Sequence, residues 1–464
     1  MNPITIPNIT IPVIGLPTIG IPSVGFPSAS GGGLSWPAGM KEHIKAIYDP
    51  KKQGLTNYDV IEAYTEDFKK WNNSPEKYTG SLTSNSLALT NVSQKTALIY
   101  SPIKPYDFKV LIRGLQEGQH VKFGFDYGEF ILEADKDGVY TLEWKEGLKS
   151  YGIYTNFVGE CNITITQLPT SILKDLSGNG NHAYLYGGKG KLNSGMGVYK
   201  QDYTTYKNDG NTNVEDVKPD TFVLLAGNLS RLGMPYKDIV GENIPAYKIN
   251  VTGITDGTVT YFYRNEDGKQ LQYVIKSDGE YELPTCYREG TEGTAVNIVA
   301  NNNSNKITIT QIPDYPDQLC YDGKMYAVCY GFPILTDYTV MADRTWFDIR
   351  SVSCFIGKRN RSGDNLGAFE FEFRANQALS FGRTNSIIFA DSGIVYQTKN
   401  SYNGIGIESG LLDDTDVLII GAAQQNINNM PQDIYIGCHG KIIIADRSFT
   451  EDEITWLKDN WKKI

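Results

Sequence analysis

The chain has 464 residues, with 43 Lys and Arg against 53 Asp and Glu, and a formal net charge of −10. This length predicts two to four domains, and the acidic balance argues against a general nucleic-acid-binding protein. Four His, and six Cys without C-x-x-C spacing, offer little material for a zinc site. The cysteines are expected to be buried, reduced thiols rather than a disulfide framework.

Residues 1–33 begin with an apolar segment in which a proline recurs every five residues. Such spacing removes amide donors and excludes both an α-helix and a membrane-spanning helix. A secretory signal is excluded as well, because no Lys or Arg precedes position 41. An extended, polyproline-like strand remains, and its apolar side chains are expected to be buried by other subunits. The predicted anchor and oligomerisation residues are Ile6, Pro7, Ile9, Ile11, Pro12, Ile14, Leu16, Pro17, Ile19, Ile21, Pro22, Val24, Phe26 and Pro27.

The alternative for this segment is a disordered proline-rich leader, although such leaders are usually poor in Ile and Val. The sequence SASGGG at 28–33 then predicts a flexible joint. Beyond the joint, short alternating segments bounded by turn residues predict strands, for example at 247–251, 306–312, 368–375 and 417–423.

One helix is predicted at the end of the chain. Thr450 and Glu453 have the spacing of a capping box, and Ile454, Leu457 and Trp461 then fall on one helical face. Further helical turns are expected within 40–48 and 58–71.

Two segments, 64–169 and 199–313, repeat one order of motifs. YDFKVLIRGLQEGQ (106–119), DKDGVYTLEW (135–144) and CNITITQLPTS (161–171) recur as AYKINVTGITDGT (246–258), KSDGEYELP (276–284) and KITITQIPDY (306–315). At offsets of 139, 141 and 144, Gly114 matches Gly253, Gly138 matches Gly279, and Gln167 matches Gln311. The strand-like spacing predicts two duplicated β-sandwich modules.

Removing both copies leaves 34–63, 170–198 and 314–464, which are predicted to form one discontinuous domain. It contains two motifs: Asp175 with Ser177, Gly178, Asn179, Gly180, Asn181 and His182, and later Asp446, Arg447, Ser448, Phe449, Thr450, Glu453 and Ile454. Together these resemble the concanavalin A-like/laminin G (LamG) jelly-roll family. The resemblance implies an all-β fold, a LamG-like jelly-roll sandwich with the two modules inserted, an extended N-terminus and a short C-terminal helix.

The same family includes glycoside hydrolases, which need two carboxylates across a cleft. The nearest candidates are Glu133 with Asp135 and Asp137, which run into a hairpin, and Glu370 with Glu372, which alternate along a half-solvated strand. Neither set predicts a catalytic pair, so we expect no enzyme.

His182 and His439 are expected to be structural, and no cofactor is predicted. Family members often hold calcium through loop oxygens, and Asp413, Asp414 and Asp416 could contribute such oxygens. Three carboxylates on one loop more often form a solvated turn, so calcium stays an open alternative.

The resemblance also implies carbohydrate binding, and aromatic platforms suit sugar stacking. The candidate glycan contacts are Tyr184 and Tyr186 in the discontinuous domain and Tyr261, Tyr263 and Tyr273 in the second module. In a chain with 30 tyrosines, packing of these rings in a sheet face is the competing interpretation.

An apolar thread, a glycine joint and a β-rich body without a secretory signal favour a virion protein, because virions leave by lysis. The passages at 48–64 and 173–199 resemble proteins encoded by phages of gut Bacteroidales, including crAss-like phages. The prediction is a head fibre, capsid decoration or tail fibre subunit at the particle surface, assembled in the host cytoplasm as a homo-oligomer, with a trimer as the expected state. Capsid or tail proteins would bind its N-terminus, and neither nucleic acid nor membrane is an expected partner. The alternatives are a bacterial extracellular glycan-binding protein and a polysaccharide depolymerase.

Overall fold

The computed structural model describes residues 34–464 apart from internal stretches at 56–61, 103–106, 125–129, 144–149, 189–199, 207–212, 228, 236–242, 288–293, 348–352, 361–365, 374–377, 382–384, 389–391, 407–412, 424–430 and 432–433. The fourteen predicted anchor residues between Ile6 and Pro27 lie outside the described residues. No helix in the described part of the chain is long and apolar enough to cross a membrane.

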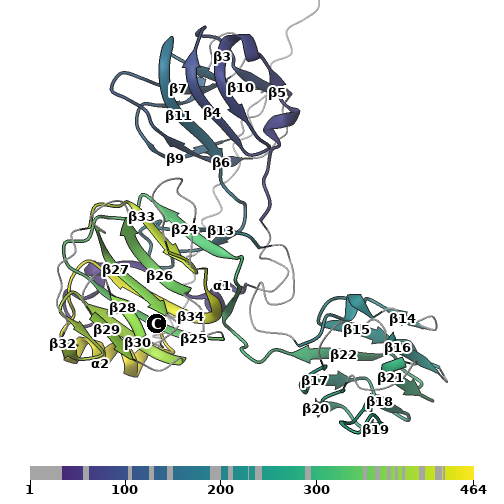
Figure 1. The fold of residues 1–464 in the computed structure, drawn as a ribbon. Coiled ribbons are helices and arrows are strands. Elements are labelled where there is room, and N and C mark those ends of the chain that lie inside the picture. The colour runs from purple at the N-terminus through teal and green to yellow at the C-terminus, as the bar shows by residue number, and fades with distance from the viewer. Residues whose placement is uncertain are drawn as a thin grey trace, which may run out of the picture.

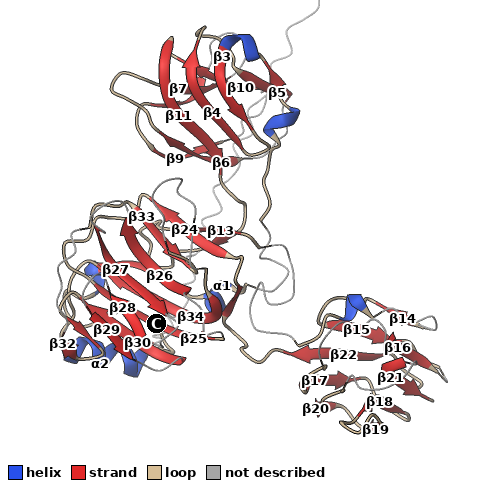
Figure 2. Cartoon of the chain, viewed as in Figure 1, coloured by secondary structure: helices blue, strands red, loops and turns tan. Residues whose placement is uncertain are grey.

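The fold is all-β, as predicted, and consists of antiparallel β-sandwiches (Figures 1 and 2). Three bodies are visible, and we call them the scaffold, module 1 and module 2. The scaffold takes its strands from 44–48, 172–186 and 319–445, while the strands of module 1 lie within 72–167 and those of module 2 within 214–312.

The scaffold packs a seven-stranded sheet against an eight-stranded one. The first has the order β1 (Ile44–Tyr48), β34 (Ile436–Ala445), β25 (Thr339–Trp346), β30 (Ser392–Thr398), β31 (Ser401–Tyr402), β32 (Ile405–Gly406), with β23 (Leu319–Asp322) also paired to β34. The second has the order β12 (Ile172–Leu173), β13 (Ala183–Tyr186), β24 (Tyr326–Tyr330), β33 (Val417–Ile420), β26 (Ser353–Asn360), β27 (Leu366–Phe373), β28 (Ala378–Phe381), β29 (Asn385–Ile388).

Module 1 has two five-stranded sheets. Their orders are β2 (Asn72–Asn73), β5 (Ile99–Pro102), β10 (Ser150–Thr155), β7 (Val121–Gly124), β8 (Phe130–Ala134), and β3 (Tyr78–Leu82), β4 (Ser86–Val92), β11 (Gly159–Gln167), β6 (Phe108–Arg113), β9 (Gly138–Leu142). Short 3₁₀ turns at Phe68–Lys70 and Pro75–Lys77 precede β3.

Module 2 repeats this topology among its described strands, except that its second sheet has four strands and no counterpart of β2. One sheet has the order β14 (Val214–Glu215), β15 (Thr221–Leu224), β22 (Ile307–Ile312), β17 (Tyr247–Thr252), β20 (Gly279–Leu283), and the other β16 (Ser230–Pro235), β21 (Thr294–Asn301), β18 (Thr258–Arg264), β19 (Gln270–Ile275). A 3₁₀ turn at Tyr203–Thr205 corresponds to the one at Phe68–Lys70.

Equivalent glycines hold equivalent backbone contacts in the two modules. Gly114 and Gly253 have φ of +90° and +102°, and an added Cβ would lie 1.8 Å from the Asn162 carbonyl oxygen and 2.1 Å from that of Lys306, respectively. Only glycine fits such a position, because a side chain would clash and the left-handed region disfavours it. The duplication therefore extends to the backbone geometry.

Equivalent glutamines close each module. The Gln167 Oε1 accepts from the Glu66 amide (2.7 Å) and its Nε2 donates to the Glu66 carbonyl (2.9 Å). Gln311 makes the same two bonds to Gln201, at 2.9 Å each. Both glutamines are buried. We call each pair of bonds an amide clasp, since it ties the last strand of a module to the segment that enters it.

The predicted C-terminal helix is present as α2 (Glu451–Asn460), and its capping box is confirmed. The Thr450 Oγ1 accepts from the Glu453 amide (3.3 Å), while Glu453 accepts from the Thr450 amide (2.9 Å). Ile454 and Leu457 are buried against the outer face of β34, which explains why nearly every residue of that strand is buried.

The predicted helical turns near the N-terminus are only partly present. Within 40–48, a 3₁₀ turn at Lys41–His43 leads directly into β1, because the alternating residues Ala46 and Tyr48 enter the scaffold core. A short α1 (Pro50–Gln53) follows. Of the expected turn at 58–71, the described part holds the 3₁₀ turn at Phe68–Lys70.

The two family-like motifs have structural contacts. Gly178 and Gly180 have positive φ, as the tight loop requires, and Asp175 accepts from the Ile47 amide of β1 (2.9 Å). Asp446 pairs with His43 and Lys45, each at 2.7 Å, whereas Arg447 forms a two-pronged pair with Glu453 of α2. These contacts fasten β1 and α2 to the scaffold.

Candidate functional site

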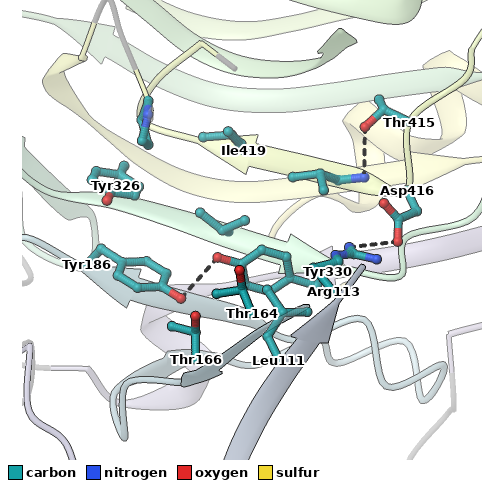
Figure 3. Close-up of a pocket in the computed structure, with 13 residues that line it drawn as sticks. Leu111, Arg113, Thr164, Thr166, Tyr186, Tyr326, Tyr330, Thr415, Asp416 and Ile419 are labelled. Atoms are coloured by element: carbon teal, nitrogen blue, oxygen red, sulfur yellow. Dashed lines mark hydrogen bonds and ion pairs between the residues drawn. The ribbon is translucent and has the colours of Figure 1, made fainter. Parts of the chain in front are cut away.

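A pocket of about 530 Å³ lies between module 1 and the scaffold (Figure 3). This volume is within the range of about 300–1,000 Å³ that is typical of small-ligand sites. Its lining combines residues of both bodies: Leu111, Arg113, Thr164 and Thr166 from module 1, and Tyr186, Tyr326, Val328, Tyr330, Thr415, Asp416, Val417, Ile419 and Pro431 from the scaffold.

The scaffold wall is the outer face of β13, β24 and β33. Strand alternation sends Leu185, Ala327, Cys329, Leu418 and Ile420 into the scaffold core. The residues between them therefore project outward, and they form an apolar and aromatic patch that consists of Tyr186, Tyr326, Val328, Tyr330, Val417 and Ile419.

The three tyrosines of this patch are held in one arrangement. The rings of Tyr186 and Tyr326 are stacked, with centroids 5.3 Å apart and planes 12° apart. The hydroxyls of Tyr186 and Tyr330 are hydrogen-bonded at 3.0 Å. Burial raises the pKa of Tyr326 to about 12 and raises the pKa of Tyr186 and Tyr330 above the ordinary value. The phenols are therefore neutral near pH 7 and can both donate and accept hydrogen bonds.

The module wall is the outer face of β6 and β11. On these strands Val110, Ile112, Ile163 and Ile165 enter the core of module 1, and the residues between them turn outward. This alternation places the apolar Leu111, the cation Arg113 and the hydroxyls of Thr164 and Thr166 at the pocket. The wall thus offers polar groups opposite the aromatic patch.

An ion pair bridges the two walls. The Arg113 Nη2 lies 2.9 Å from the Asp416 Oδ2, and the two side chains keep 28% and 45% of their exposure. Arg113 and Asp416 carry the two formal charges in the lining, so the pocket has no net charge. An uncharged polar ligand fits this balance better than an ion.

The turn that carries Asp416 is itself fixed by a buried ion pair. The Lys358 Nζ lies 2.5 Å from the Asp413 Oδ2, with both side chains fully buried, and it also donates to the Thr415 carbonyl. Desolvation lowers the pKa of Lys358, and Asp413 opposes that shift. The expected solvated turn is thus wrong for Asp413, because Lys358 holds this carboxylate inside the protein.

The calcium alternative gains no support from this turn, because Asp413 pairs with Lys358 and Asp416 with Arg113. Within the described ranges, no group of three His, Cys, Asp or Glu side chains is arranged to hold a metal ion.

The predicted glycan contacts have different surroundings. Tyr186 lines the pocket, while Tyr184 lies beside it, nearly buried, with its ring centroid 6.3 Å from that of Tyr330. In module 2, Tyr261 is fully buried and Tyr263 stacks on it with centroids 5.5 Å apart. Tyr273 faces Tyr261 across β18 and β19 and packs on the same core. Tyr261 is therefore a packing residue in this structure, because its ring is closed to a ligand.

Two of the acidic candidates for catalysis, Glu133 and Asp137, have structural partners. Glu133 lies 2.5 Å from His120 and 3.0 Å from Lys122, and its hydrogen bond to His120 lowers the pKa of Glu133. Asp137 accepts from the Gly114 and Leu115 amides, each at 2.9 Å. The side chains of Glu370 and Glu372 lie outside the described residues.

The two histidines singled out in the sequence also have structural contacts. The His182 Nδ1 accepts from the Asp175 amide at 3.0 Å. His439 is fully buried; its Nδ1 donates to the Gly440 carbonyl (2.7 Å), and its Nε2 accepts from the Tyr321 hydroxyl (3.0 Å). Both rings thus serve as hydrogen-bonded parts of the scaffold.

Most residues of the pocket were not predicted from the sequence. Tyr326 and Tyr330 carry the alternation typical of a strand, and nothing in their spacing distinguishes them from the other tyrosines. Arg113 and Asp416 are 303 residues apart. Only the docking of an inserted module on its host brings them together.

Comparisons with known proteins do not show a family. No protein-family model and no curated protein matches the chain. Among solved structures, Trypanosoma rangeli sialidase in complex with sialic acid is 9% identical over 83% of each chain, with a TM-score of 0.24. The same sialidase in complex with 2,3-difluorosialic acid is 10% identical over 90% of this chain and 91% of that chain, also with a TM-score of 0.24. Likeness at this level carries no argument about fold or activity.

Proposed function

We propose that this chain is a structural subunit of a bacteriophage particle, a head fibre, capsid decoration or tail fibre protein, whose β-rich body binds glycans. The N-terminal pentads would anchor it to the particle, and the pocket between module 1 and the scaffold would hold the sugar. The observation that carries the binding role is the tyrosine patch of this pocket, which faces hydroxyl-bearing and oppositely charged side chains.

The chemistry of the pocket suits a carbohydrate. Aromatic rings pack against the apolar C–H faces of a sugar, and neutral phenols and threonine hydroxyls can exchange hydrogen bonds with its hydroxyls. The Arg113–Asp416 pair can donate to and accept from the same ligand without leaving a net charge. We infer that the ligand is a short neutral oligosaccharide.

The particle role is supported by the sequence of the first 33 residues. Fourteen apolar or ring-constrained side chains recur there with a period of five. A segment of this kind gains most when neighbouring subunits or particle proteins bury it, and a trimer of such strands is the arrangement we propose.

The particle role is tested by incorporation. The full chain and a variant with Ile9, Ile14 and Ile19 changed to Asp are supplied to particles that lack the native protein. We expect the charged variant to fold and to be lost from purified particles, because burial of three carboxylates opposes docking. Thr10→Asp with Thr18→Asp is the matched control, since both threonines lie outside the apolar register. Equal incorporation of both variants would contradict the proposed anchor.

The binding role is tested on a glycan array with the full chain. Tyr186→Ala and Tyr326→Ala should abolish the signal, while Tyr263→Ala in module 2 should keep it. Circular dichroism and thermal melting establish that each variant is folded. Binding without particle association would favour a bacterial extracellular protein, and release of reducing ends from host capsule would favour a depolymerase.

A further inference from the structure

Two cysteines that are distant in sequence face each other across two strands of the scaffold. Cys320 of β23 is the direct antiparallel partner of Cys438 of β34, and both are fully buried. Facing residues of antiparallel strands have Cα atoms about 4.5–5.5 Å apart. Disulfides span Cα separations of about 4.4–6.8 Å, so this backbone needs no rearrangement to be cross-linked.

The two sulfurs also converge on one residue. The Cys438 Sγ donates to the Gln318 side-chain Oε1 at 2.8 Å, and the Cys320 Sγ lies 3.9 Å from the Gln318 backbone oxygen. Leu319 and Tyr321 enter the scaffold core, so alternation places Cys320 on the other face of the sheet, and facing residues share a face. Both thiols therefore lie on the same side of the ladder.

The pairing is specific among the six cysteines, each of which carries a thiol in this structure. Cys161 belongs to module 1 and Cys286 to module 2, while Cys329 and Cys354 lie on strands of the other scaffold sheet. Only Cys320 and Cys438 are partners in a strand register.

The position of the two cysteines indicates what a cross-link between them would stabilise. β23 is the first strand after module 2, whose last strand ends at Ile312, and its ladder partner among the described strands is β34. At its C-terminal end, module 2 is joined to the scaffold through this short strand. A covalent bond between Cys320 and Cys438 would keep β23 attached when its hydrogen bonds open.

We propose that Cys320 and Cys438 form a cross-strand disulfide after the protein leaves the reducing cytoplasm; this timing rests on the proposed particle role. Because both thiols are fully buried, the reaction requires transient opening of β23. A thiolate of the pair then attacks an external low-molecular-weight disulfide and releases one small thiol. The second thiolate then attacks the mixed disulfide and releases the other. The two cysteines lose two electrons and two protons in total, and the external disulfide is reduced to two thiols.

The full-length protein tests this pairing. It is unfolded under reducing conditions and refolded in a buffer of oxidised and reduced glutathione. The refolded protein is then denatured in the presence of an alkylating reagent, so that buried thiols also react, and digested without reduction. We expect one cross-linked peptide pair, which joins Cys320 to Cys438, and alkylation of the other four cysteines. The link should disappear in Cys438→Ser and persist in the matched control Cys354→Ser.

Two results would overturn the proposal: complete alkylation of Cys320 and Cys438 in correctly refolded protein, or a mixture of pairings. A further readout uses limited proteolysis, in which the oxidised protein should resist cleavage between 313 and 322 longer than the reduced protein. The same peptide analysis of purified particles, alkylated before they are disrupted, then tests the timing. The disulfide should be present in these released particles. A disulfide in refolded protein whose incorporation test fails would reject the particle role and keep the cross-link.

Discussion

Apart from β2 of module 1, modules 1 and 2 have the same strand order, but module 1 lines the pocket on the scaffold and module 2 contributes none of its described lining residues. At offsets of 139 and 144, the outer face of β6 and β11 in module 1 matches that of β17 and β22 in module 2. The threonines are retained, as Thr308 and Thr310, but Thr252 replaces Arg113 and Asn250 replaces Leu111. Module 2 therefore lacks the cation that reaches Asp416 from module 1. The two modules thus differ at exposed positions of one face, while their strand order in this sheet is the same.

The largest expected effect is a loss of stability when the equivalent glycine of either module is replaced. Gly114→Ala and Gly253→Ala should each destabilise their own module by about 4 kcal/mol, because backbone strain adds to the clash with a carbonyl. Hydrogen exchange of the full chain should show the loss confined to the altered module. Gly118→Ala is the matched control, since Gly118 also has positive φ (+79°) but open space around it. Equal effects at Gly114 and Gly118 would contradict the role of the close contact.

The next effect concerns the amide clasps. Gln167→Ala and Gln311→Ala each remove two buried hydrogen bonds and leave a backbone amide and carbonyl to find new partners. Gln311→Ala also removes a partly buried bond from the Lys200 amide (2.8 Å). We expect a loss of about 3 kcal/mol in each module. Denaturant titrations followed by module-specific hydrogen exchange measure both losses. Strongly unequal losses would mean that the two clasps are not equivalent.

Acid should destabilise the scaffold more than module 2. Burial lowers the pKa of His439 to about 4, so the unfolded chain, with an ordinary imidazole, binds this proton first. Scaffold stability should therefore fall as the pH drops from about 6.5 towards 4, by about 2 kcal/mol at pH 5. Module 2 contains none of the four histidines and serves as the control within the same chain. Exchange rates in β34 and β22 at pH 7 and pH 5 make the measurement; parallel changes would contradict it.

The smallest expected effect concerns the contact between module 1 and the scaffold. Arg113→Ala should weaken the contact between module 1 and the scaffold by about 0.5 kcal/mol, since the ion pair with Asp416 is partly exposed. Small-angle scattering should then report a larger radius of gyration, with unchanged melting of each sandwich. Thr252→Ala in module 2 should change neither quantity. An identical scattering profile for Arg113→Ala would show that other contacts fix module 1.

Local sequence signals predicted much of the fold. The capping box at Thr450 and Glu453, the positive φ of Gly178 and Gly180, and the strands that begin at 247 and 417 are all present. Each depends on a few neighbouring residues, so each is visible without tertiary information. The duplication was visible because Gly114 and Gly253, and likewise Gln167 and Gln311, perform the same local task.

The candidate site depended on contacts that local patterns do not encode. Tyr186 was a candidate by residue type, and Tyr261 was a candidate by the same argument, yet one lines a pocket and the other is fully buried. Both lie in alternating strands, and only the identity of the facing layer separates them. Residues 44–48 illustrate the same limit, since apolar spacing compatible with a helical turn became a strand beside β34.

The amide clasps have a consequence for how such chains change over time. Because Glu66 and Gln167 are hydrogen-bonded, the two ends of module 1 lie next to each other. For the scaffold chain, the whole module therefore spans no more distance than a short loop. A module whose ends adjoin can be removed, duplicated or exchanged without changing how the strands of the scaffold are connected. The same arrangement at Gln201 and Gln311 makes the second unit equally portable, and a recombined chain could acquire a new surface while keeping its foundation intact.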